Sequence, residues 1–249
     1  MRVHSLTILH YGKDYLPYAI KSVYDNVDKA HVFYTPTPSH GHSTDILPIE
    51  TKEQLLQAAY AYDPADKVRW YDMLHVRHEG IQRDTALDIV KADGADMIVV
   101  LDCDEVWPAG LAHEFIHVAS QSNTVRNWLV NMTHFWRSFN WACNDQGWPV
   151  RIIDLRHDNG VAYLPQESGK IFHFGYAIRD KVMRYKWQIH GHKNELRQNW
   201  FDDKWSQWPP PNDCHPTNDK GFWIPEPFDK GKLPDFMRIH PFYNLERID

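Results

Sequence analysis

The sequence contains few cysteines, no excess of basic charge and no long apolar run. Its three cysteines, Cys103, Cys143 and Cys214, are odd in number and widely spaced, which argues against a disulfide framework and a cysteine-type zinc site. Lys and Arg total 27 against 33 Asp and Glu, giving a formal net charge of −6, so the chain lacks the basic surface of a duplex-binding protein. We therefore expect a protein of a reducing compartment for which nucleic acid is not the main partner.

The apolar segments are also too short for a membrane protein. No segment approaches the roughly 20 apolar residues of a membrane span, and the apolar stretch after Met1 is too short for a signal peptide. We expect a soluble, cytoplasmic chain without internal repeats. Its 249 residues can bury a substantial core as a single domain. Aromatic residues are abundant, at 14% with 11 Trp, and we expect most of them to be buried.

The amino-terminal half alternates short apolar runs with helical patterns. Strands are predicted at 6–9, 31–34, 67–76 and 97–101, and helices at 15–26, 51–62 and 79–94. This order predicts right-handed crossovers and parallel pairing of the strands. Thr51 precedes Gln54 by three residues, which indicates a capping box at the start of the second helix. One apolar stripe is expected on the third helix, formed by Ile81, Thr85, Ala86, Ile89 and Val90.

The carboxyl-terminal half is less regular. A helix is predicted at 109–120 after Pro108, and antiparallel strands are expected within 127–142 and 150–158. From Trp200 to Tyr243 the chain is rich in Pro, Gly, Asp and aromatics. We expect this part to be an extended wrap or lid over the core, because its many Trp and Phe need a surface against which to bury.

An acidic cluster follows the strand predicted at 97–101. In "MIVVLDCDEVWP" five apolar residues run into Asp102, Cys103, Asp104 and Glu105. If the strand geometry persists, Asp102 and Asp104 project from the same face. Carboxylates so close together need a cation, an arginine or a proton to balance them. The carboxyl end of a central strand is where open α/β sheets bind their ligands.

Three segments resemble one known family, the GT-A glycosyltransferases of the family-2-like group. "LTILHYGKDYLPYAIKSVYDNVDKAHVFY" resembles the opening strand, loop and helix of these enzymes. "GIQRDTALDIVKADGADMIVVLDCDEVWP" resembles their central block, an arginine-containing helix, an apolar strand and Asp-x-Asp. "GKIFHFGYAIRDKVMRYK" resembles the His-aromatic-Gly-aromatic segment that follows their acceptor region.

The resemblance implies an α/β fold of GT-A type, a Rossmann-like, mostly parallel sheet flanked by helices. Residues 1–199 would form the glycosyltransferase domain, with 1–107 as the nucleotide-sugar-binding half and 108–199 as the acceptor-side half. Residues 200–249 would be the wrap or lid of the same domain. The implied activity is transfer of a sugar from a nucleoside-diphosphate sugar to a carbohydrate or glycoconjugate acceptor.

The resemblance also implies a divalent cation, Mn²⁺ or Mg²⁺, that bridges the donor diphosphate. Asp104 would be its main ligand and a catalytic residue, and Asp102 would reach the ribose or, through water, the cation. Oxygen ligands and a phosphate partner suit such a cation. His173 is the expected third ligand by its position in the pattern, and His190 and His192 compete for that role.

Further donor contacts are expected from two other segments. The first loop, formed by His10, Tyr11 and Gly12, would approach the nucleotide base, and Arg83 would neutralise phosphate or Asp102. Many relatives carry an acidic residue after the second strand, whereas this chain has "YTPTPSHG" there. That departure leaves the identity of the nucleotide open.

A catalytic base is needed only if the enzyme inverts the anomeric centre. By order along the chain, Glu167 is the best candidate, followed by Asp154 and Asp158. Two other readings stay open at this stage. Carboxylates at strand ends also serve metal-dependent phosphohydrolases and nucleotidyltransferases, and the Trp-rich tail is compatible with a non-catalytic carbohydrate-binding module.

Overall fold

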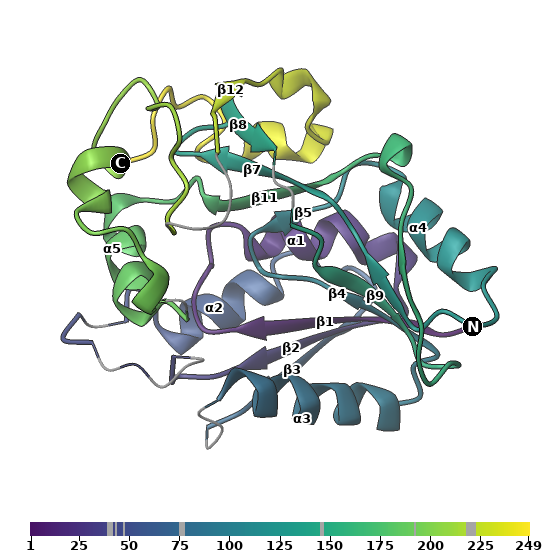
Figure 1. The fold of residues 1–249 in the computed structure, drawn as a ribbon. Coiled ribbons are helices and arrows are strands. Elements are labelled where there is room, and N and C mark those ends of the chain that lie inside the picture. Colours follow the sequence, from purple (N-terminus) through teal and green to yellow (C-terminus); the bar gives the residue numbers. More distant parts are fainter. Residues whose placement is uncertain are drawn as a thin grey trace.

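The fold joins two β-sheets and their flanking helices. The computed structural model describes residues 1–38, 42, 44–46, 48–74, 78–144, 147–191, 193–217 and 223–249. Within them, a seven-stranded sheet, called sheet A here, and a five-stranded sheet, called sheet B, lie one above the other (Figure 1). The predicted α/β class, with a mostly parallel sheet flanked by helices, is confirmed.

The elements have the following bounds. The strands are β1 (Val3–Leu9), β2 (Lys29–Tyr34), β3 (Val68–Asp72), β4 (Met97–Val100), β5 (Glu105–Val106), β6 (Asn127–Leu129), β7 (Met132–Trp136), β8 (Trp141–Asn144), β9 (Val150–Asp154), β10 (Val161–Tyr163), β11 (Ile171–Tyr176) and β12 (Glu226–Pro227). The α-helices are α1 (Leu16–Val23), α2 (Lys52–Ala59), α3 (Glu79–Ala92), α4 (Leu111–Ser120) and α5 (Asp180–Ile189). Short 3-10 turns occur at 24–26, 166–168, 193–195, 230–232 and 235–239, and a π-helical turn at 201–205.

Sheet A has the strand order β10-β6-β9-β4-β1-β2-β3. The four strands of the amino-terminal half, β3, β2, β1 and β4, pair in parallel, as predicted. Beyond β4, strand β9 runs antiparallel to both β4 and β6. The strand that precedes the acidic cluster therefore lies inside the sheet, between one parallel and one antiparallel neighbour.

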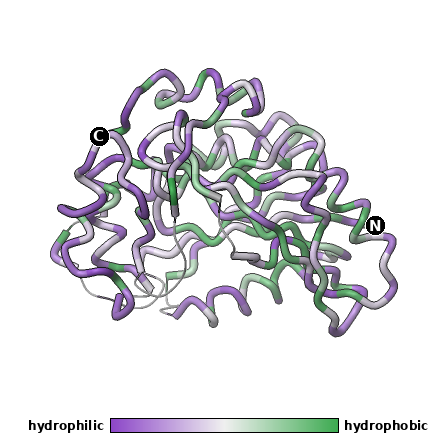
Figure 2. The backbone as a smooth tube through the Cα atoms, turned by 45° about the horizontal axis from the view of Figure 1, so that its top comes forward, coloured by the Kyte–Doolittle hydropathy of each residue, from purple (hydrophilic) through white to green (hydrophobic). Residues whose placement is uncertain are grey.

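Helices cover both faces of sheet A. Helix α3 buries Ala86 and Val90 against Leu6 of β1 and Ile98 of β4. Helices α1, α2 and α4 cover the opposite face, where they pack against β1, β2 and β4. Hydrophobic residues are concentrated in the interior strands, whereas the outer turns consist mainly of hydrophilic residues (Figure 2).

Sheet B has the order β12-β8-β7-β11-β5. The segment from residue 200 onward packs onto this sheet, so that Trp200, Trp205, Trp223 and Phe242 join the same core as Phe135 and Phe174. The sheet borders α5, which adds Val182 and Met183 to that core. Strand β5, which begins with Glu105 at the end of the acidic cluster, is an edge strand of sheet B.

Two local predictions have different outcomes. The capping box is confirmed, since the Thr51 hydroxyl accepts from the Gln54 amide and the Gln54 side chain accepts from the Thr51 amide. The stripe on α3 is partly wrong, because Ile81 is 59% exposed and Gln82 is buried in its place. The helix turns its first residues toward a polar cavity, which places Gln82 inside and Ile81 outside.

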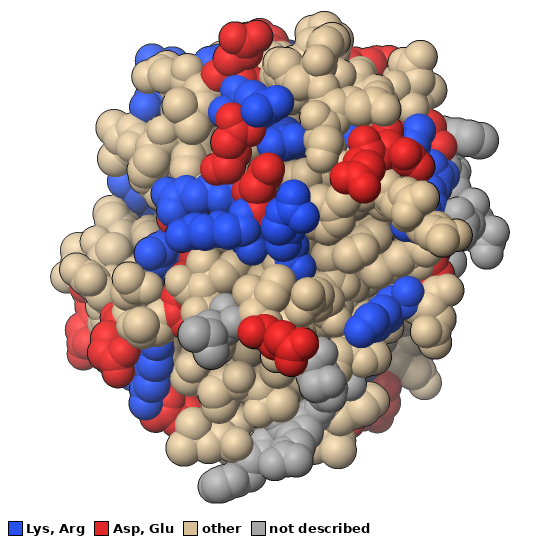
Figure 3. Space-filling view, turned by 90° about the vertical axis from the view of Figure 1, so that its left-hand side faces the viewer, with Lys and Arg blue, Asp and Glu red and all other residues tan. Residues whose placement is uncertain are grey.

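The surface is mixed in charge on the face that carries α5. Lys and Arg side chains form a band there that is bordered by Asp and Glu (Figure 3). Such mixing on this face differs from the uniform basic surface typical of duplex binding. Among the described residues, no helix combines the length and apolarity needed to cross a membrane.

Candidate functional site

A cavity of about 540 Å³ opens at the carboxyl edge of sheet A. Its volume lies within the roughly 300–1,000 Å³ common for small-molecule sites. The walls come from the loops after β1, β2 and β4, the start of α3, strand β11 and the end of α5. The described residues that line it are Ile8, His10, Tyr11, Thr35, Glu79, Gln82, Arg83, Asp102, Cys103, Asp104, His173, Lys186, Ile189, His190 and Gly191.

The acidic cluster lies on a turn that carries the chain from sheet A to sheet B. The Glu105 amide donates to the Asp102 carbonyl at 3.1 Å, which closes the turn between β4 and β5. The expectation that Asp102 and Asp104 extend a strand on one face is therefore wrong. The turn separates their environments, although both residues line the cavity.

Asp102 is balanced by an arginine. Arg151 Nη2 donates to Asp102 Oδ2 at 2.6 Å, while Arg151 Nε donates to the buried Glu105 carboxylate at 2.8 Å. Burial opposes the charge on Arg151, but Asp102 and Glu105 outweigh it and raise its pKa above the ordinary value. Arg151 thus ties β9 to the acidic turn and pairs with both carboxylates. Burial still outweighs this pairing at Glu105 and raises the pKa of that group to about 8.

Asp104 lies beside His173 in the lining of the cavity. Asp104 Oδ1 lies 3.6 Å from His173 Nε2. Burial raises the pKa of Asp104, and Lys186 partly offsets this. Burial, with His134, Lys186 and Arg151, lowers the pKa of His173 well below its ordinary value. His173 is therefore a neutral imidazole at neutral pH, the form that can bind a metal ion.

His134 forms a hydrogen bond with Nδ1 of His173, the ring nitrogen that does not face Asp104. The two residues are paired across β7 and β11, and their Nδ1 atoms lie 2.6 Å apart. One ring must donate and the other accept. When His173 donates from Nδ1, its Nε2 carries no proton and faces Asp104 as a potential ligand. Such a partner on the second ring nitrogen is typical of metal-binding histidines.

Gly175 leaves the space beside this pair open. A Cβ atom at this position would lie 2.8 Å from His173 Nε2 and 3.0 Å from Asp104 Oδ2. Gly175 is not among the glycines with positive φ, so the backbone there does not itself require glycine. Any side chain at 175 would fill the region where Asp104 and His173 could share an ion.

Two cationic groups, Lys186 and Arg151, lie beside the three carboxylates of the acidic turn. Lys186 on α5 lines the cavity and donates to the Gly175 carbonyl at 3.0 Å. With Arg151 it opposes Asp102, Asp104 and Glu105, and burial raises the pKa of Glu105 to about 8, so these five groups carry a net charge between −1 and 0 at neutral pH. A divalent cation would make the set positive and the cavity attractive to a diphosphate.

The first loop is fixed against the acidic turn. Gly12 has φ of +125°, and a Cβ there would lie 2.4 Å from Cys103 Sγ. The buried Glu50 carboxylate accepts from the Gly12 amide at 2.6 Å and the Lys13 amide at 3.1 Å. Gly12 itself is not among the cavity-lining residues. Its lack of a side chain allows the loop to approach Cys103 closely.

His10 and Arg83 both line the cavity. His10 Nδ1 contacts the Thr35 carbonyl at 2.8 Å and Nε2 contacts the Tyr185 hydroxyl at 2.7 Å. Burial lowers the pKa of His10, so its ring is neutral. Arg83 pairs with Glu79 one turn earlier on α3, at 2.5 Å. The Arg83 guanidinium is half exposed and lies at the cavity rim.

Several candidate residues lie elsewhere. Glu167 is exposed on the 3-10 turn at 166–168 and lines neither this cavity nor the adjoining one. Asp154 is buried in an ion pair with Arg156, and Asp158 is exposed. His190 lines the cavity, and His192 lies outside the described residues.

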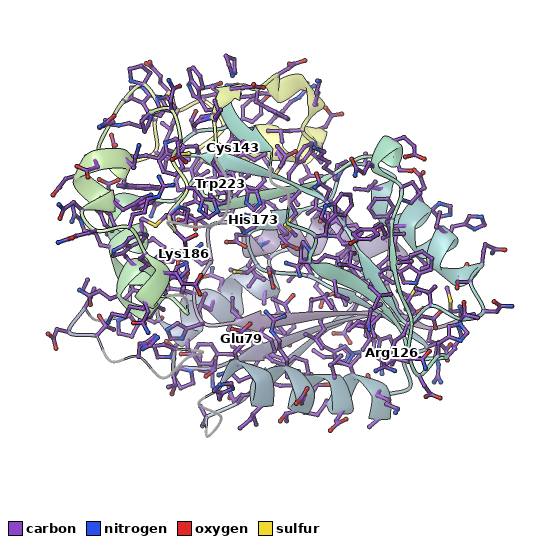
Figure 4. The ribbon with its side chains drawn as sticks, viewed as in Figure 1. Glu79, Arg126, Cys143, His173, Lys186 and Trp223 are labelled. Atoms are coloured by element: carbon purple, nitrogen blue, oxygen red, sulfur yellow. The ribbon has the colours of Figure 1, made fainter. Side chains whose placement is uncertain are left out.

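A second cavity of about 290 Å³ adjoins the first and shares His173, Lys186 and His190 with it. Trp223 and Tyr176 contribute its aromatic walls. In Figure 4, Trp223, His173 and Lys186 lie close together beside α5, and Glu79 lies below them at the start of α3. The two cavities thus meet at His173 and Lys186.

Sequence reasoning missed His134, Arg151, Lys186 and Glu50. Lys186 ends the segment "GKIFHFGYAIRDKVMRYK", but nothing in that segment shows that α5 turns it toward the cavity. Arg151 and His134 reach the site through strand pairing, which no local spacing reveals. Glu50 lies in a loop without any pattern.

Comparisons with known proteins give only distant likenesses. The sequence matches no protein-family profile and no curated protein. The structure is similar to that of TarS from S. aureus, with a TM-score of 0.43 and 13% identity over 76% of this chain and 39% of TarS. It is also similar to 4-diphosphocytidyl-2C-methyl-D-erythritol synthase from Anaerococcus prevotii, with a TM-score of 0.41 and 7% identity over 78% of this chain and 96% of that one. This chain thus spans well under half the length of TarS.

Proposed function

We propose that the protein is a metal-dependent glycosyltransferase that moves a sugar from a nucleoside-diphosphate sugar to a carbohydrate or glycoconjugate acceptor. The observation that carries the proposal is the pairing of Asp104 with neutral His173 beside the space that Gly175 leaves open. Two ligand atoms held about 2.1 Å from one ion at angles of about 90–110° lie roughly 3.0–3.5 Å apart. The observed 3.6 Å is close to that separation.

We assign Asp104 and His173 as direct ligands of Mn²⁺ or Mg²⁺, with oxygens of the donor diphosphate and of water supplying the oxygen-rich remainder that these ions prefer. When bound, such a cation would supply a Lewis acid that stabilises the negative charge growing on the leaving diphosphate. Asp102 is held by Arg151, so we assign it to the ribose or to a water-mediated contact. Lys186 is placed to bind phosphate oxygens.

The remaining walls suit the two substrates. His10, whose ring stacks on Tyr185, and Tyr11, whose ring meets Tyr185 edge-on, would border the nucleotide base. Arg83 would approach the phosphates from the cavity rim. The adjoining cavity with Trp223 would receive the acceptor, since an aromatic plane packs well against the C–H face of a sugar. Glu167 lies outside both cavities, and we assign it no part in the reaction.

The test measures cation-dependent binding first and turnover second. Thermal-shift assays with nucleoside diphosphates and Mn²⁺ would identify the donor base, because a ligand that binds the native state raises the melting temperature. Asp104→Asn should abolish the Mn²⁺-dependent part of that shift and lower transfer about 100-fold or more. Gly175→Ala should weaken Mn²⁺ binding, because its methyl group would crowd His173 and Asp104.

Asp158→Asn is the matched control, since Asp158 is an exposed aspartate outside both cavities, and it should retain full activity. Full transfer by Asp104→Asn in the presence of EDTA would refute the metal assignment. Pyrophosphate release from a nucleoside triphosphate would identify a nucleotidyltransferase instead. Hydrolysis of the nucleotide that needs only water would identify a phosphohydrolase.

A further inference from the structure

A second cluster of metal-ligating side chains lies at the opposite edge of sheet A. His4 is near the start of β1, His31 is on the adjacent β2, and Asp93 caps the carboxyl end of α3. Among the described residues, these three form the only group of at least three His, Cys, Asp or Glu whose ligand atoms all lie within 4.8 Å of one another. The cluster shares no residue with the proposed sugar-transfer site.

The distances within the cluster suit a common ion. His31 Nε2 lies 3.1 Å from His4 Nδ1 and 3.4 Å from Asp93 Oδ2. Ligand atoms about 2.0–2.2 Å from one zinc ion, at roughly tetrahedral angles, lie about 3.3–3.6 Å apart. Small rotations of the two rings would therefore bring all three atoms within bonding distance of one ion.

The surroundings already orient the ligands. His4 is 1% and His31 0% exposed, so strand packing holds both rings in place. His31 Nδ1 contacts the Tyr71 hydroxyl at 3.2 Å. When Nδ1 donates to that hydroxyl, Nε2 is left without a proton and faces His4 and Asp93, as in metal sites whose histidines are held by an outer partner.

Lys29 competes for the same carboxylate. Its ammonium group contacts Asp93 Oδ1 at 2.6 Å and Oδ2 at 2.7 Å. The Lys29 side chain is 33% exposed, and its flexible stem can turn the charge into solvent. Asp93, which is 31% exposed in its side chain, would then be available to an entering ion.

We propose that His4, His31 and Asp93 form a second metal site, which takes Zn²⁺ or a similar late divalent transition ion with water as fourth ligand. Two imidazoles and one carboxylate match the ligand preference of zinc, unlike the oxygen-rich sets that hold Mg²⁺. The bound ion would join β1 and β2 to the end of α3, far from the cavity. The site is independent of the proposed glycosyl transfer.

The test titrates the metal-free full chain with ZnCl2 in a calorimeter, alongside three variants. Asp93→Asn removes the most accessible ligand and should weaken binding of one zinc equivalent about 10-fold or more. Lys29→Met removes the competing charge and should tighten it. Asp104→Asn should leave this equivalent unchanged, which separates it from the cation proposed for catalysis. Circular dichroism of each variant confirms that it is folded.

Nuclear magnetic resonance of ¹⁵N-labelled histidines locates the ion among the 16 histidines of the chain. Zinc should shift the His4 Nδ1 and His31 Nε2 resonances in the wild type and in Lys29→Met. Failure of the wild type to bind zinc, or equal affinity in Asp93→Asn, would overturn the proposal. Loss of the same equivalent in Asp104→Asn would also overturn it, by assigning the zinc to the cavity.

Discussion

The two sheets of this protein are stabilised by different kinds of packing. Sheet A is held by aliphatic strands that alternate with amphipathic helices, and its core is dominated by Val, Leu, Ile and Ala. Sheet B and the segment beyond residue 200 share a core built largely of aromatic rings, such as Phe135, Trp136, Phe174, Trp200 and Trp205. The first region follows simple periodic patterns, whereas the second depends on contacts between residues far apart in sequence.

The proposed site lies where these regions meet. Asp104 comes from the turn that leaves sheet A, and His173 and His134 come from adjacent strands of sheet B. Neither region alone supplies both Asp104 and His173. The aromatic core contributes to this arrangement, because residues of β11 and α5 both pack in it.

The largest effect on stability is expected from removing one ring of the aromatic core. Trp200 is 1% exposed, stacks on Trp187 with ring centroids 4.4 Å apart, and donates from Nε1 to the Cys214 carbonyl at 3.1 Å. Trp200→Ala should lower the free energy of unfolding by about 3–5 kcal/mol. Urea denaturation followed by circular dichroism would measure the change.

Leu55→Ala provides the counterpart in the aliphatic region. Leu55 is 0% exposed on α2, and its truncation should cost about 2–5 kcal/mol. We expect Trp200→Ala to be at least as destabilising and also to weaken Mn²⁺ binding at the cavity, whereas Leu55→Ala should spare it. A Trp200→Ala change under about 1 kcal/mol would show that the aromatic core is not what fixes sheet B.

The difference between the two regions explains which parts of the structure could be predicted from the sequence. The parallel strands and α1 to α3 follow from apolar spacing, and Thr51 marks a helix start by local chemistry alone. The turn after β4 could not be predicted, because Glu105 enters another sheet. Asp102 and Asp104 therefore lie on a turn and do not continue β4 as an extended strand. That event depends on the pairing of Glu105 with His173, 68 residues later.

Site residues follow the same division. The resemblance of the sequence to GT-A enzymes directed attention to Asp104, His173, His10 and Arg83, all of which line the cavity. Glu167 was chosen by chain order, a criterion that carries no spatial information once the chain enters sheet B. A partner such as Arg151 could have been expected from the rule that buried carboxylates require one. That rule does not indicate which arginine supplies it.

The second prediction compares one buried histidine in each region. Burial lowers the pKa of His31, in sheet A, to about 4, and burial likewise lowers the pKa of His240, in the carboxyl-terminal segment, to about 4. Both rings are neutral in the folded protein, whereas in the unfolded chain they protonate near pH 6.5. Below that pH the unfolded state binds more protons, so stability falls as the pH decreases from about 6.5 to about 4.

Each histidine should account for about 3 kcal/mol of that loss, because its pKa is about 6.5 in the unfolded chain and about 4 in the folded protein. His240 Nε2 donates to the Asp14 carbonyl at 2.9 Å, and Nδ1 accepts from the Phe242 amide at 3.0 Å. His240→Gln should flatten the decline of unfolding free energy between pH 6.5 and 4, measured by urea denaturation in EDTA. His31→Phe should do the same from the other region. An unchanged slope in both variants would contradict the assignment.

The smallest effect is expected at the start of α2, where stability comes from local backbone contacts and not from packing. The Thr51 hydroxyl accepts from the Gln54 amide at 3.3 Å as half of the capping box. Thr51→Ala leaves that amide without its partner and should cost about 1 kcal/mol. Thr124→Ala, at an exposed threonine in a loop, is the matched control and should stay within about 0.5 kcal/mol of the wild type. Equal losses of unfolding free energy in the two variants would show that water replaces the hydroxyl of Thr51. The start of α2 would then depend on tertiary contacts.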